Sequence, residues 1–382
     1  MVIWTEVLFW VCILMTIYVY FGYPICLCLI SCLTRKQIIK KEITPMVTFL
    51  ISVYNEEKVI RERIENLLQL DYPKEKLEII IASDGSTDKT DEIVKEYEEK
   101  GIILKRLERG GKLVALNKII PTVRGEIVIL SDANVFCQKD AVRMLVRNFY
   151  EDEIGCVSGD VRLLGGVSFE KGESLYYKYE RFLQKKESEI HSLIGADGAL
   201  YAIRKRLYFP PPPEGATDDF VISMEIAKAG YRTIYEDKAK AFEDSAPTSK
   251  EEFSKKVRVV AAAFQCLKLG AGIPTISQPA LLFEYISHKL LRWFVPFFLI
   301  GVFVSNLFLL NLLFYQICLL LQLVFYICAF CGLISKVKIK IFSIPLYFCI
   351  VNVASLVGFF RGIVGQQTCA WQPITRTKKS KI

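Results

Sequence analysis

The chain has 382 residues, a formal net charge of +8, 52% hydrophobic residues and a mean hydropathy of +0.31. The apolar excess lies at the two ends, where Val7–Thr34, Trp293–Ser335 and Ile341–Phe360 contain no charged residue. Because about 20 apolar residues cross a bilayer, we expect one membrane span near the start and two or three after residue 292. These segments exclude a soluble cytoplasmic enzyme, a secreted disulfide-linked scaffold and a channel made only of membrane spans.

The first apolar segment is long, has no basic residue before it and is followed by the cations of Arg35–Lys41. These features favour a retained transmembrane anchor over residues 1–34 and not a cleaved signal peptide. Cations next to a span tend to stay on the cytoplasmic side. We therefore expect a multi-pass protein of the plasma or inner membrane, with a catalytic domain over residues 35–275 in the cytoplasm.

The first half of this domain alternates short apolar runs with amphipathic stretches. The predicted strands are Val47–Val53, Leu77–Ala82, Ile102–Leu107 and Ile127–Leu130, and the predicted helices between them are Glu56–Leu70, Asp88–Lys100 and Gly111–Val123. This alternation is typical of an α/β fold with a mostly parallel sheet and helices on both faces. Ligands bind such sheets at the carboxyl ends of the strands, so the residues that follow each strand are the first candidates for a site.

The second half is less regular. We expect helices over Gly172–His191, Asp218–Ala229 and Lys250–Lys268, and strands over Gly198–Ile203 and Tyr231–Tyr235. Beyond the domain, Glu284, His288 and Arg292 recur every four residues opposite apolar positions, which predicts an amphipathic helix in the membrane interface over 276–292. His191 and His288 are interpreted as surface or interface residues.

A C-terminal membrane region over 293–365, with two to three spans, and a basic tail over 366–382 complete the expected organisation. Trp371 and the cations after it are typical of an interfacial anchor. Four full spans in the chain would place this tail outside, against the charge tendency. A re-entrant last segment and an exceptional tail both stay open.

The basic residues beside the spans favour binding to anionic membrane lipids. The soluble domain lacks the basic, aromatic-rich face that would bind nucleic acid, so no nucleic-acid partner is expected. Most of the 12 Cys lie in or beside apolar segments, where Cys behaves as a small hydrophobe. Neither a zinc site nor a disulfide framework is expected.

Acidic residues stand at the predicted strand ends and at one helix start, namely Asp84, Asp132 and the pair Asp218–Asp219. Each one alone is explained by a turn or an N-cap, but two of them follow strands at the same edge of one sheet. No G-x-G-x-x-G follows a strand, and Gly110–Lys112 lacks the earlier Gly and the following Ser or Thr of a P-loop. A G-x-S-x-G hydrolase motif is also missing.

Taken together, these motifs resemble those of the family 2 glycosyltransferases, inverting enzymes with the GT-A fold. The matching stretches, in the family's order, are VTFLISVYNEE (47–57), LEIIIASDGSTDKT (77–90), GKLVALN (111–117), GEIVILSDAN (125–134), GADGALYAIRK (195–205), TDDF (217–220) and KKVR (255–258). One anchor before the domain and several spans after it resemble the membrane-bound members that make bacterial polysaccharides or lipid-linked glycans.

The resemblance implies that Tyr54, Glu56 and Asp84 bind the nucleotide of a sugar donor, expected to be a UDP-sugar. It places Lys112 near the nucleotide and its diphosphate. Asp132 matches the first acid of the family's DxD motif. A carboxylate there would help to hold Mg²⁺ or Mn²⁺, which neutralises the diphosphate leaving group.

The later motifs imply the other roles. Asp219 matches the last acid of the family's T-E-D motif, with Asp218 in the place of Glu. This carboxylate would take the proton of the acceptor hydroxyl as that hydroxyl attacks the anomeric carbon from the far face, which inverts the configuration. Asp197 and Gly198 match the acceptor side, and Arg258 supplies a cation for the diphosphate.

Two departures from the family pattern matter. Asn134 stands at the third position of the DxD motif, where a neutral carbonyl oxygen would be a weaker metal ligand. Val259 replaces the Trp of the Q-x-x-R-W motif of processive synthases. We therefore favour transfer of one or a few sugars to a lipid-linked or growing glycan acceptor. A processive polysaccharide synthase and a catalytically silent nucleotide-sugar-binding subunit of a glycan assembly complex are the alternatives.

Overall fold

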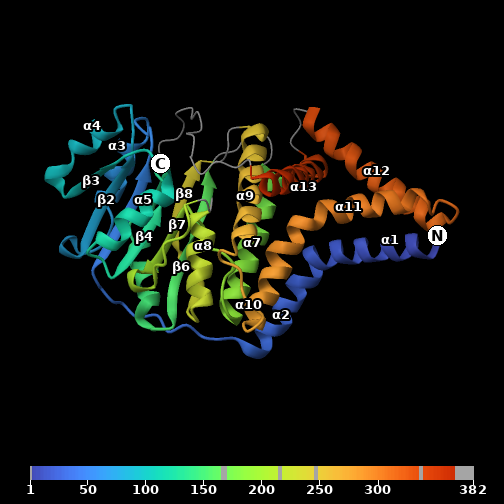
Figure 1. Cartoon of the computed structure of the whole chain (residues 1–382), viewed down its shortest axis with the longest axis horizontal. Helices are drawn as coiled ribbons and strands as arrows, with labels where there is room; N and C mark the ends of the chain where they lie inside the picture. Colours follow the sequence, from blue (N-terminus) through green and yellow to red (C-terminus); the bar gives the residue numbers. More distant parts are fainter. Residues whose placement is uncertain (1, 165–169, 214–216, 245–247, 335–338, 366–382) are drawn as a thin grey trace.

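The structure is a computed structural model that describes residues 2–164, 170–213, 217–244, 248–334 and 339–365. An α/β domain lies on one side of the molecule, and long helices extend away from it on the other (Figure 1). The tail over 366–382, with Trp371, lies outside the described residues.

Within the described residues, eight strands form one sheet in the order β3-β2-β1-β4-β7-β6-β8-β5. Their bounds are β1 Val47–Val53, β2 Leu77–Asp84, β3 Ile102–Leu107, β4 Ile127–Ser131, β5 Val135–Cys137, β6 Ile154–Leu164, β7 Leu200–Arg204 and β8 Arg232–Asp244. The strands β3, β2, β1 and β4 are parallel to one another, and β6 is parallel to β8. Strand β7 is antiparallel to β4 and β6, and β5 is antiparallel to β8. The predicted mostly parallel sheet is confirmed.

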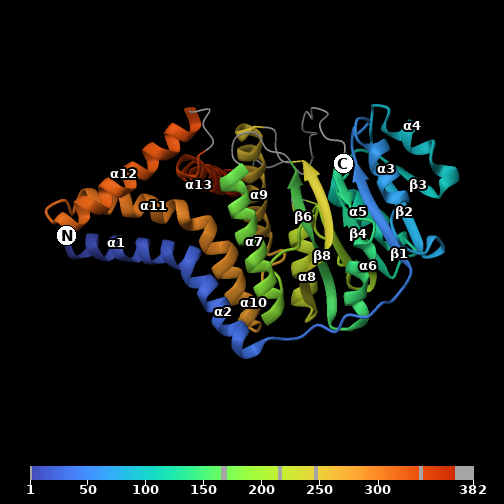
Figure 2. The ribbon, with the colours of Figure 1, turned by 180° about the vertical axis from the view of Figure 1, so that it is seen from behind.

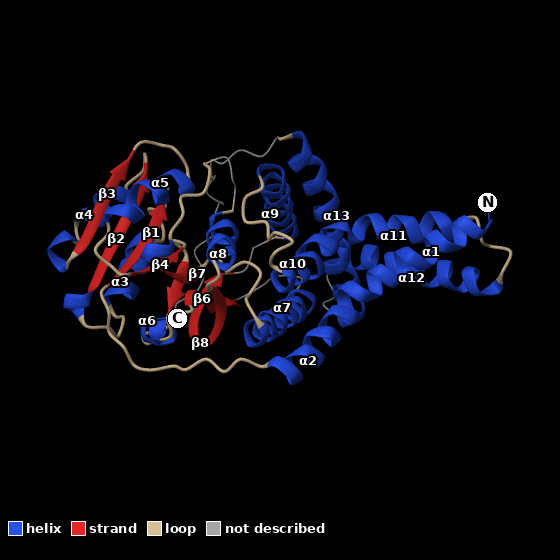
Figure 3. Cartoon of the chain, turned by 60° about the horizontal axis from the view of Figure 1, so that its bottom comes forward, coloured by secondary structure: helices blue, strands red, loops and turns tan. Residues whose placement is uncertain are grey.

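Helices cover both faces of this sheet (Figure 3). Their bounds are α3 Ile60–Leu68, α4 Thr90–Lys95, α5 Lys112–Ile119, α6 Ala141–Val146, α7 Glu170–Ile190, α8 Asp218–Lys228 and α9 Ser249–Leu269. Alternate residues of β1 explain the two layers, because Phe49 packs with the core of α3, α4 and α6, and Leu50 with the core of α5 and α8. Each such fully buried side chain contributes about 1.5–3 kcal/mol to folding.

The differences from the predicted elements have local causes. Strand β6 was missed because Gly155, Ser158 and Gly159 interrupt its apolar pattern. Strand β8 continues past Tyr235 through charged residues, and a register shift opposite β6 accommodates them. Helix α3 begins at Ile60 and not at Glu56, because the chain after β1 first makes a turn.

In the described part of the chain, four helices are long and apolar enough to cross a membrane, namely Val2–Thr34, Pro279–Leu307, Leu313–Ile334 and Lys340–Val364. They comprise α1 Val2–Ile17 and α2 Tyr23–Thr34, α10 Pro279–Tyr285 and α11 Leu291–Leu307, α12 Leu313–Ile334, and α13 Lys340–Val364. In the first two, a π-helical segment joins the parts, Tyr18–Gly22 and Ile286–Leu290 respectively. Figure 2 shows α1 and α11 side by side and directed away from the sheet, while α2 and α10 lie close to α7.

The segment 276–292 does not present its polar side chains to an interface. Glu284, His288 and Arg292 are buried, because α7 carries acidic side chains opposite them. Arg292 forms an ion pair with Glu180, and His288 Nδ1 lies 2.5 Å from Oε1 of Glu187. The interpretation of His288 as a surface or interface residue is wrong, and the polar face of this helix joins the α/β domain to the long apolar helices.

Glu187 is the centre of this buried junction, since it also accepts a hydrogen bond of 2.6 Å from the hydroxyl of Tyr23. Breaking a buried network of this kind costs about 3–5 kcal/mol. We therefore expect Glu187→Ala to lower the unfolding temperature of the detergent-purified protein. Glu189→Ala, on the same helix but in a more exposed ion pair with Lys186, should change it little. Equal effects of the two substitutions, measured by thermal unfolding, would contradict this account.

Candidate functional site

The predicted nucleotide-binding residues lie together at the carboxyl ends of β1 and β2. Asp84 ends β2 with only 2% of its surface exposed, and its carboxylate accepts hydrogen bonds from the backbone N–H groups of Gly110 and Gly111 at 2.8 and 2.9 Å. The guanidinium of Arg109 forms an ion pair with Asp84 and lies 3.4 Å from the ring centroid of Tyr54. The loop before α5 therefore joins the two strand ends.

Arg109 was not identified from the sequence, although the next two glycines were noted. Its position requires glycine at 85, because a Cβ there would lie 2.9 Å from the backbone N of Arg109, and the φ of Gly85 is +71°. A guanidinium over a tyrosine ring is a favourable cation–π contact. Glu56 is buried in the turn after β1, where its N–H donates to Oγ1 of Thr90 at 2.8 Å.

The predicted catalytic and metal-binding residues form a second group around Lys112. The ammonium of Lys112 lies 2.8 Å from Oδ1 of Asp132 and 3.1 Å from Oδ2 of Asp218. The hydroxyl of Tyr201 also donates to Asp218, at 3.3 Å. The end of β4 and the first turns of α5 and α8 therefore meet at one point, as the resemblance implied.

Asp219 follows Asp218 on the first turn of α8 and packs against Gly198. A Cβ at position 198 would lie only 2.7 Å from Oδ2 of Asp219, so no larger residue fits there without a shift. Burial and the neighbouring Asp218 carboxylate raise the pKa of Asp219 to about 7, although Lys112 opposes them. A carboxylate with this pKa is a stronger base than an ordinary aspartate and is still ionised in a large fraction of molecules at neutral pH.

Asp197 and Asp132 lie in the same charge cluster. Burial raises the pKa of Asp197 to about 6, and Glu243 adds to the rise. The side chain of Asp132 is 41% exposed. Partial burial raises its pKa, but Lys112 outweighs this effect, with help from more distant cations, and holds the pKa of Asp132 below its usual value. Asp132 is therefore an accessible anion.

Two cations from α9 complete the cluster. Lys255 lies 3.8 Å from Oε1 of Glu243, and it acts with Arg258 on the carboxylate of Asp132. Arg258 makes no ion pair with any residue in the described part of the chain. Its charge is therefore free to interact with an anionic ligand at the strand ends.

The residues of the site could supply only part of the ligand shell of a divalent cation. The carboxylate of Asp132 and the amide oxygen of Asn134 are the hard oxygen ligands that Mg²⁺ and Mn²⁺ take. Across the described ranges, no group of three or more His, Cys, Asp or Glu could hold a metal ion alone. Such a pair suits an ion that shares its remaining positions with water and substrate phosphates, which is the usual arrangement for Mg²⁺.

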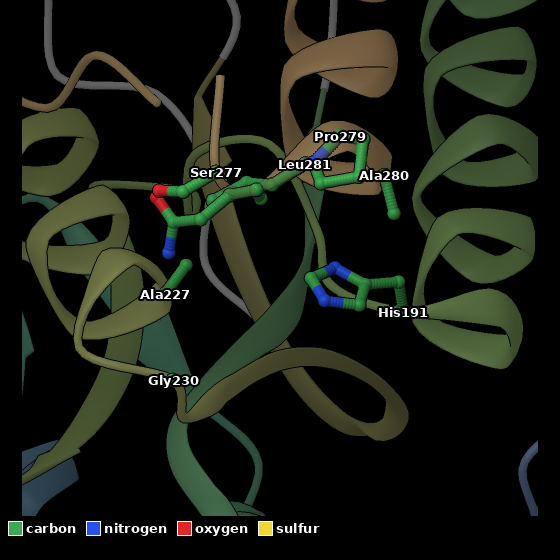
Figure 4. A pocket seen from close by; sticks show the side chains of 8 residues that line it. His191, Ala227, Gly230, Ser277, Pro279, Ala280 and Leu281 are labelled. Carbon is green, nitrogen blue, oxygen red and sulfur yellow. The ribbon is translucent and has the colours of Figure 1, made fainter. Parts of the chain in front are cut away.

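A cavity of about 290 Å³ lies away from this site (Figure 4). It is lined by His191, Ala227, Gly230, Ser277, Gln278, Pro279, Ala280 and Leu281. Gly230 precedes β8, so the cavity lies near the amino end of that strand and opposite to the edge that carries the carboxylates. It contains none of the predicted site residues.

Comparisons with known proteins identify similar glycosyltransferases. The family model described as Glycosyl transferase family 2 matches residues 48–206. The chain is 27% identical over 316 residues to "Probable glycosyltransferase YdaM" of Bacillus subtilis (strain 168), covering 78% of this chain and 74% of that protein. It is 28% identical over 212 residues to a poly-beta-1,6-N-acetyl-D-glucosamine synthase of Staphylococcus aureus (strain COL), covering 53% of this chain and about half (51%) of the length of the synthase.

The fold has a solved counterpart in the mannosyltransferase PcManGT from Pyrobaculum calidifontis, in complex with GDP-Man and Mn²⁺. The TM-score is 0.73 at 20% identity, and the match covers 93% of this chain and 99% of that chain. The chain has the GT-A fold, its residues 48–206 match glycosyltransferase family 2, and its relatives include a protein of polysaccharide synthesis. Its enzyme class is that of a glycosyltransferase, and its four apolar helices indicate association with a membrane.

The raised pKa of Asp219 predicts a stability effect with a definite sign. The pKa is about 7 in the folded chain and about 3.9 in an unfolded chain, so the folded state holds this proton more tightly. This contribution to stability is fully present below about pH 3.9 and is lost progressively as the pH rises from there through about 7. We expect Asp219→Asn to raise the unfolding temperature at pH 8 by a few degrees, at about 2–4 °C per kcal/mol, and to have a smaller effect at pH 5.

Asp218→Asn is the matched comparison for this measurement. It removes an ion-pair partner of Lys112, so it should lower the unfolding temperature at pH 8. Thermal unfolding of both variants at the two pH values separates the carboxylates. A loss of stability at pH 8 in Asp219→Asn would show that the carboxylate of Asp219 is not under electrostatic strain.

Proposed function

We propose that the protein is a membrane-bound inverting glycosyltransferase that moves a sugar from a nucleotide sugar, expected to be a UDP-sugar, to a lipid-linked or growing glycan acceptor. The observation that carries the proposal is Asp219. It is a half-buried carboxylate with a pKa of about 7, beside the Lys112 ammonium that bridges two other carboxylates. A candidate base and a cation that can bind an anionic ligand therefore lie together at the carboxyl ends of the strands.

In the proposed reaction, the carboxylate of Asp219 takes the proton from an acceptor hydroxyl. The hydroxyl oxygen forms a bond to the anomeric carbon on the face opposite to the diphosphate, and the bond from that carbon to the diphosphate oxygen breaks. The configuration is inverted because attack and departure occur on opposite faces. Lys112 and Arg258 stabilise the negative charge that develops on the leaving diphosphate.

The donor is bound by both groups of the site. Tyr54, Asp84 and Glu56 take the nucleotide, and Arg109, which contacts the first two, lies where it can contact it as well. When Mg²⁺ or Mn²⁺ is bound, held by Asp132 and Asn134, it neutralises charge on the diphosphate. The GDP-Man and Mn²⁺ bound to the mannosyltransferase of similar fold support a nucleotide-sugar donor and a divalent cation here.

The acceptor side faces the membrane helices. Asp197 and Gly198 stand next to Asp219, and α9, which carries Arg258, packs closely on the candidate span α13. A Cβ on Gly358 would lie 2.7 Å from Cβ of Val260, and such small residues allow close helix contacts in membranes. This packing supports an acceptor held at the cytoplasmic face of the plasma or inner membrane, in a multi-pass protein.

Two alternatives remain distinct from this proposal. Similarity to a poly-beta-1,6-N-acetyl-D-glucosamine synthase favours processive synthesis. Against it, the position that carries Trp in processive synthases is here an exposed Val259. A silent nucleotide-sugar-binding subunit would not need a base whose pKa is raised to about 7. Product length, measured with a labelled donor, separates one or a few transfers from processive synthesis.

The central test is release of the nucleoside diphosphate from a panel of nucleotide sugars by purified protein in lipid with Mn²⁺. We expect the wild type to use one donor, with a rate that rises with pH through about 7. Asp219→Asn should reduce the rate by about 10²-fold or more, within the range for general base catalysis, and should still bind UDP. Asp237→Asn, an exposed residue on β8, is the control. Loss of UDP binding in Asp219→Asn would refute its role as base.

The metal is tested through Asp132. We expect Asp132→Ala to abolish the stimulation of nucleotide release by added Mn²⁺, because the only carboxylate of the proposed metal pair is removed. Asp152→Ala removes a fully exposed carboxylate elsewhere on the domain and should leave the Mn²⁺ titration unchanged. An unchanged titration in Asp132→Ala would show that Asp132 is not a ligand.

A further inference from the structure

Asn134 has a carboxylate partner that the sequence motif does not contain. Asn134 directly precedes β5, and β5 is antiparallel to the end of β8 with Val135 opposite Glu243. This register places the side chain of Glu243 against Asn134, whose Nδ2 donates to Oε1 of Glu243 at 2.9 Å. Only 16% of the Glu243 side chain is exposed, so the pair is partly shielded from solvent.

We propose that Glu243 is a positioning residue for the divalent cation. It orients the amide of Asn134 so that its oxygen faces the metal position, and it supplies the negative charge that the third position of the motif lacks. This inference rests on the proposed metal-assisted function.

The hydrogen-bond chemistry fixes the orientation of the amide. An ionised carboxylate can only accept hydrogen bonds, and of the two polar atoms of the Asn amide only the nitrogen donates. Glu243 must therefore face Nδ2, which turns Oδ1 of Asn134 away from β8. In the described part of the chain no donor occupies that Oδ1, so the oxygen is available as a ligand.

The charges of Glu243 and Asp132 act on the same cation, Lys255. Lys255, which lies 3.8 Å from Glu243, also acts on Asp132. The distance to Lys255 is longer than a hydrogen bond, so Asn134 is the closer partner. Partners that hydrogen-bond to metal ligands orient them and tune their basicity, and their loss lowers metal affinity by about 10–100-fold. Asp132 and Glu243 together thus carry the two negative charges that two Asp residues carry in a DxD motif.

The test measures Mn²⁺ binding without turnover, by electron paramagnetic resonance of the full-length protein in lipid with UDP, and with GDP as a second probe. We expect Glu243→Gln to weaken Mn²⁺ binding by about 10-fold or more, while binding of the nucleotide without metal stays unchanged. Asp237→Asn removes an exposed carboxylate from the same strand and should bind Mn²⁺ as the wild type does.

A charge exchange separates positioning from a general structural role. In the double variant Asn134→Asp with Glu243→Gln, the Gln amide can donate to the new Asp, and the charge returns to the cluster. We expect Mn²⁺ affinity to recover to within about 3-fold of the wild type, because the pair is restored in reverse. If Glu243 only supported the local fold or Lys255, Asn134→Asp would change the Mn²⁺ affinity by the same factor in the wild-type background as in Glu243→Gln, whereas a positioning role predicts a larger gain in Glu243→Gln.

The outcomes are distinct. Unchanged Mn²⁺ binding in Glu243→Gln, or weakened binding that the double variant does not restore, overturns the role of Glu243 and leaves the proposed function intact. A wild type that binds nucleotide but no Mn²⁺ overturns the metal-assisted function and this inference with it. Weakened binding in Glu243→Gln with recovery in the double variant supports both.

Discussion

The ammonium of Lys112 is the contact on which the site depends. It lies within ion-pair distance of Asp132 at the end of β4 and of Asp218 at the start of α8, and it is fixed by the first turn of α5. Without this ammonium, the carboxylates of Asp132, Asp218 and Asp219 would repel one another in a partly buried space at the carboxyl ends of the strands. Lys112 and Asp218 are only 27% and 12% exposed, so their ion pair stabilises the position of α8 and offsets the negative charge of its first turn.

The ammonium of Lys112 also influences the pKa of Asp219. Burial and Asp218 raise the pKa of Asp219 to about 7, and Lys112 limits the rise. A weaker cation would leave Asp219 protonated at neutral pH and unable to accept a proton, whereas direct pairing with a cation would make it a weak base. Lys112 pairs with Asp218 and not with Asp219, so it anchors the helix while Asp219 stays basic. Perturbed pKa values of this kind concentrate at catalytic sites.

How far the sequence predicts this arrangement depends on whether each contact is local. The four strands of the first half begin at the predicted residues because each has an apolar run, which is buried on both faces in β1, β2 and β4 and less so in the edge strand β3. The motif carboxylates follow from the strand ends. Arg109 and Glu243 could not be found, because their partners are far away in sequence and depend on strand order and register. The periodicity of 276–292 revealed a polar face but not its cover, which is the acidic side of α7.

Helix α9 contacts both the charged candidate site and the candidate span α13. Lys255 and Arg258 act on Asp132 from one side of the helix, while Val260 and Ala261 meet Gly358 and Gly362 of α13 on another. Because no side chain separates the two helices at those glycines, α13 cannot move closer to α9 without moving the backbone that carries both cations. In the proposed function, the diphosphate charge would be neutralised from a helix that packs on a candidate membrane span, and this packing would hold the donor site close to an acceptor at the membrane.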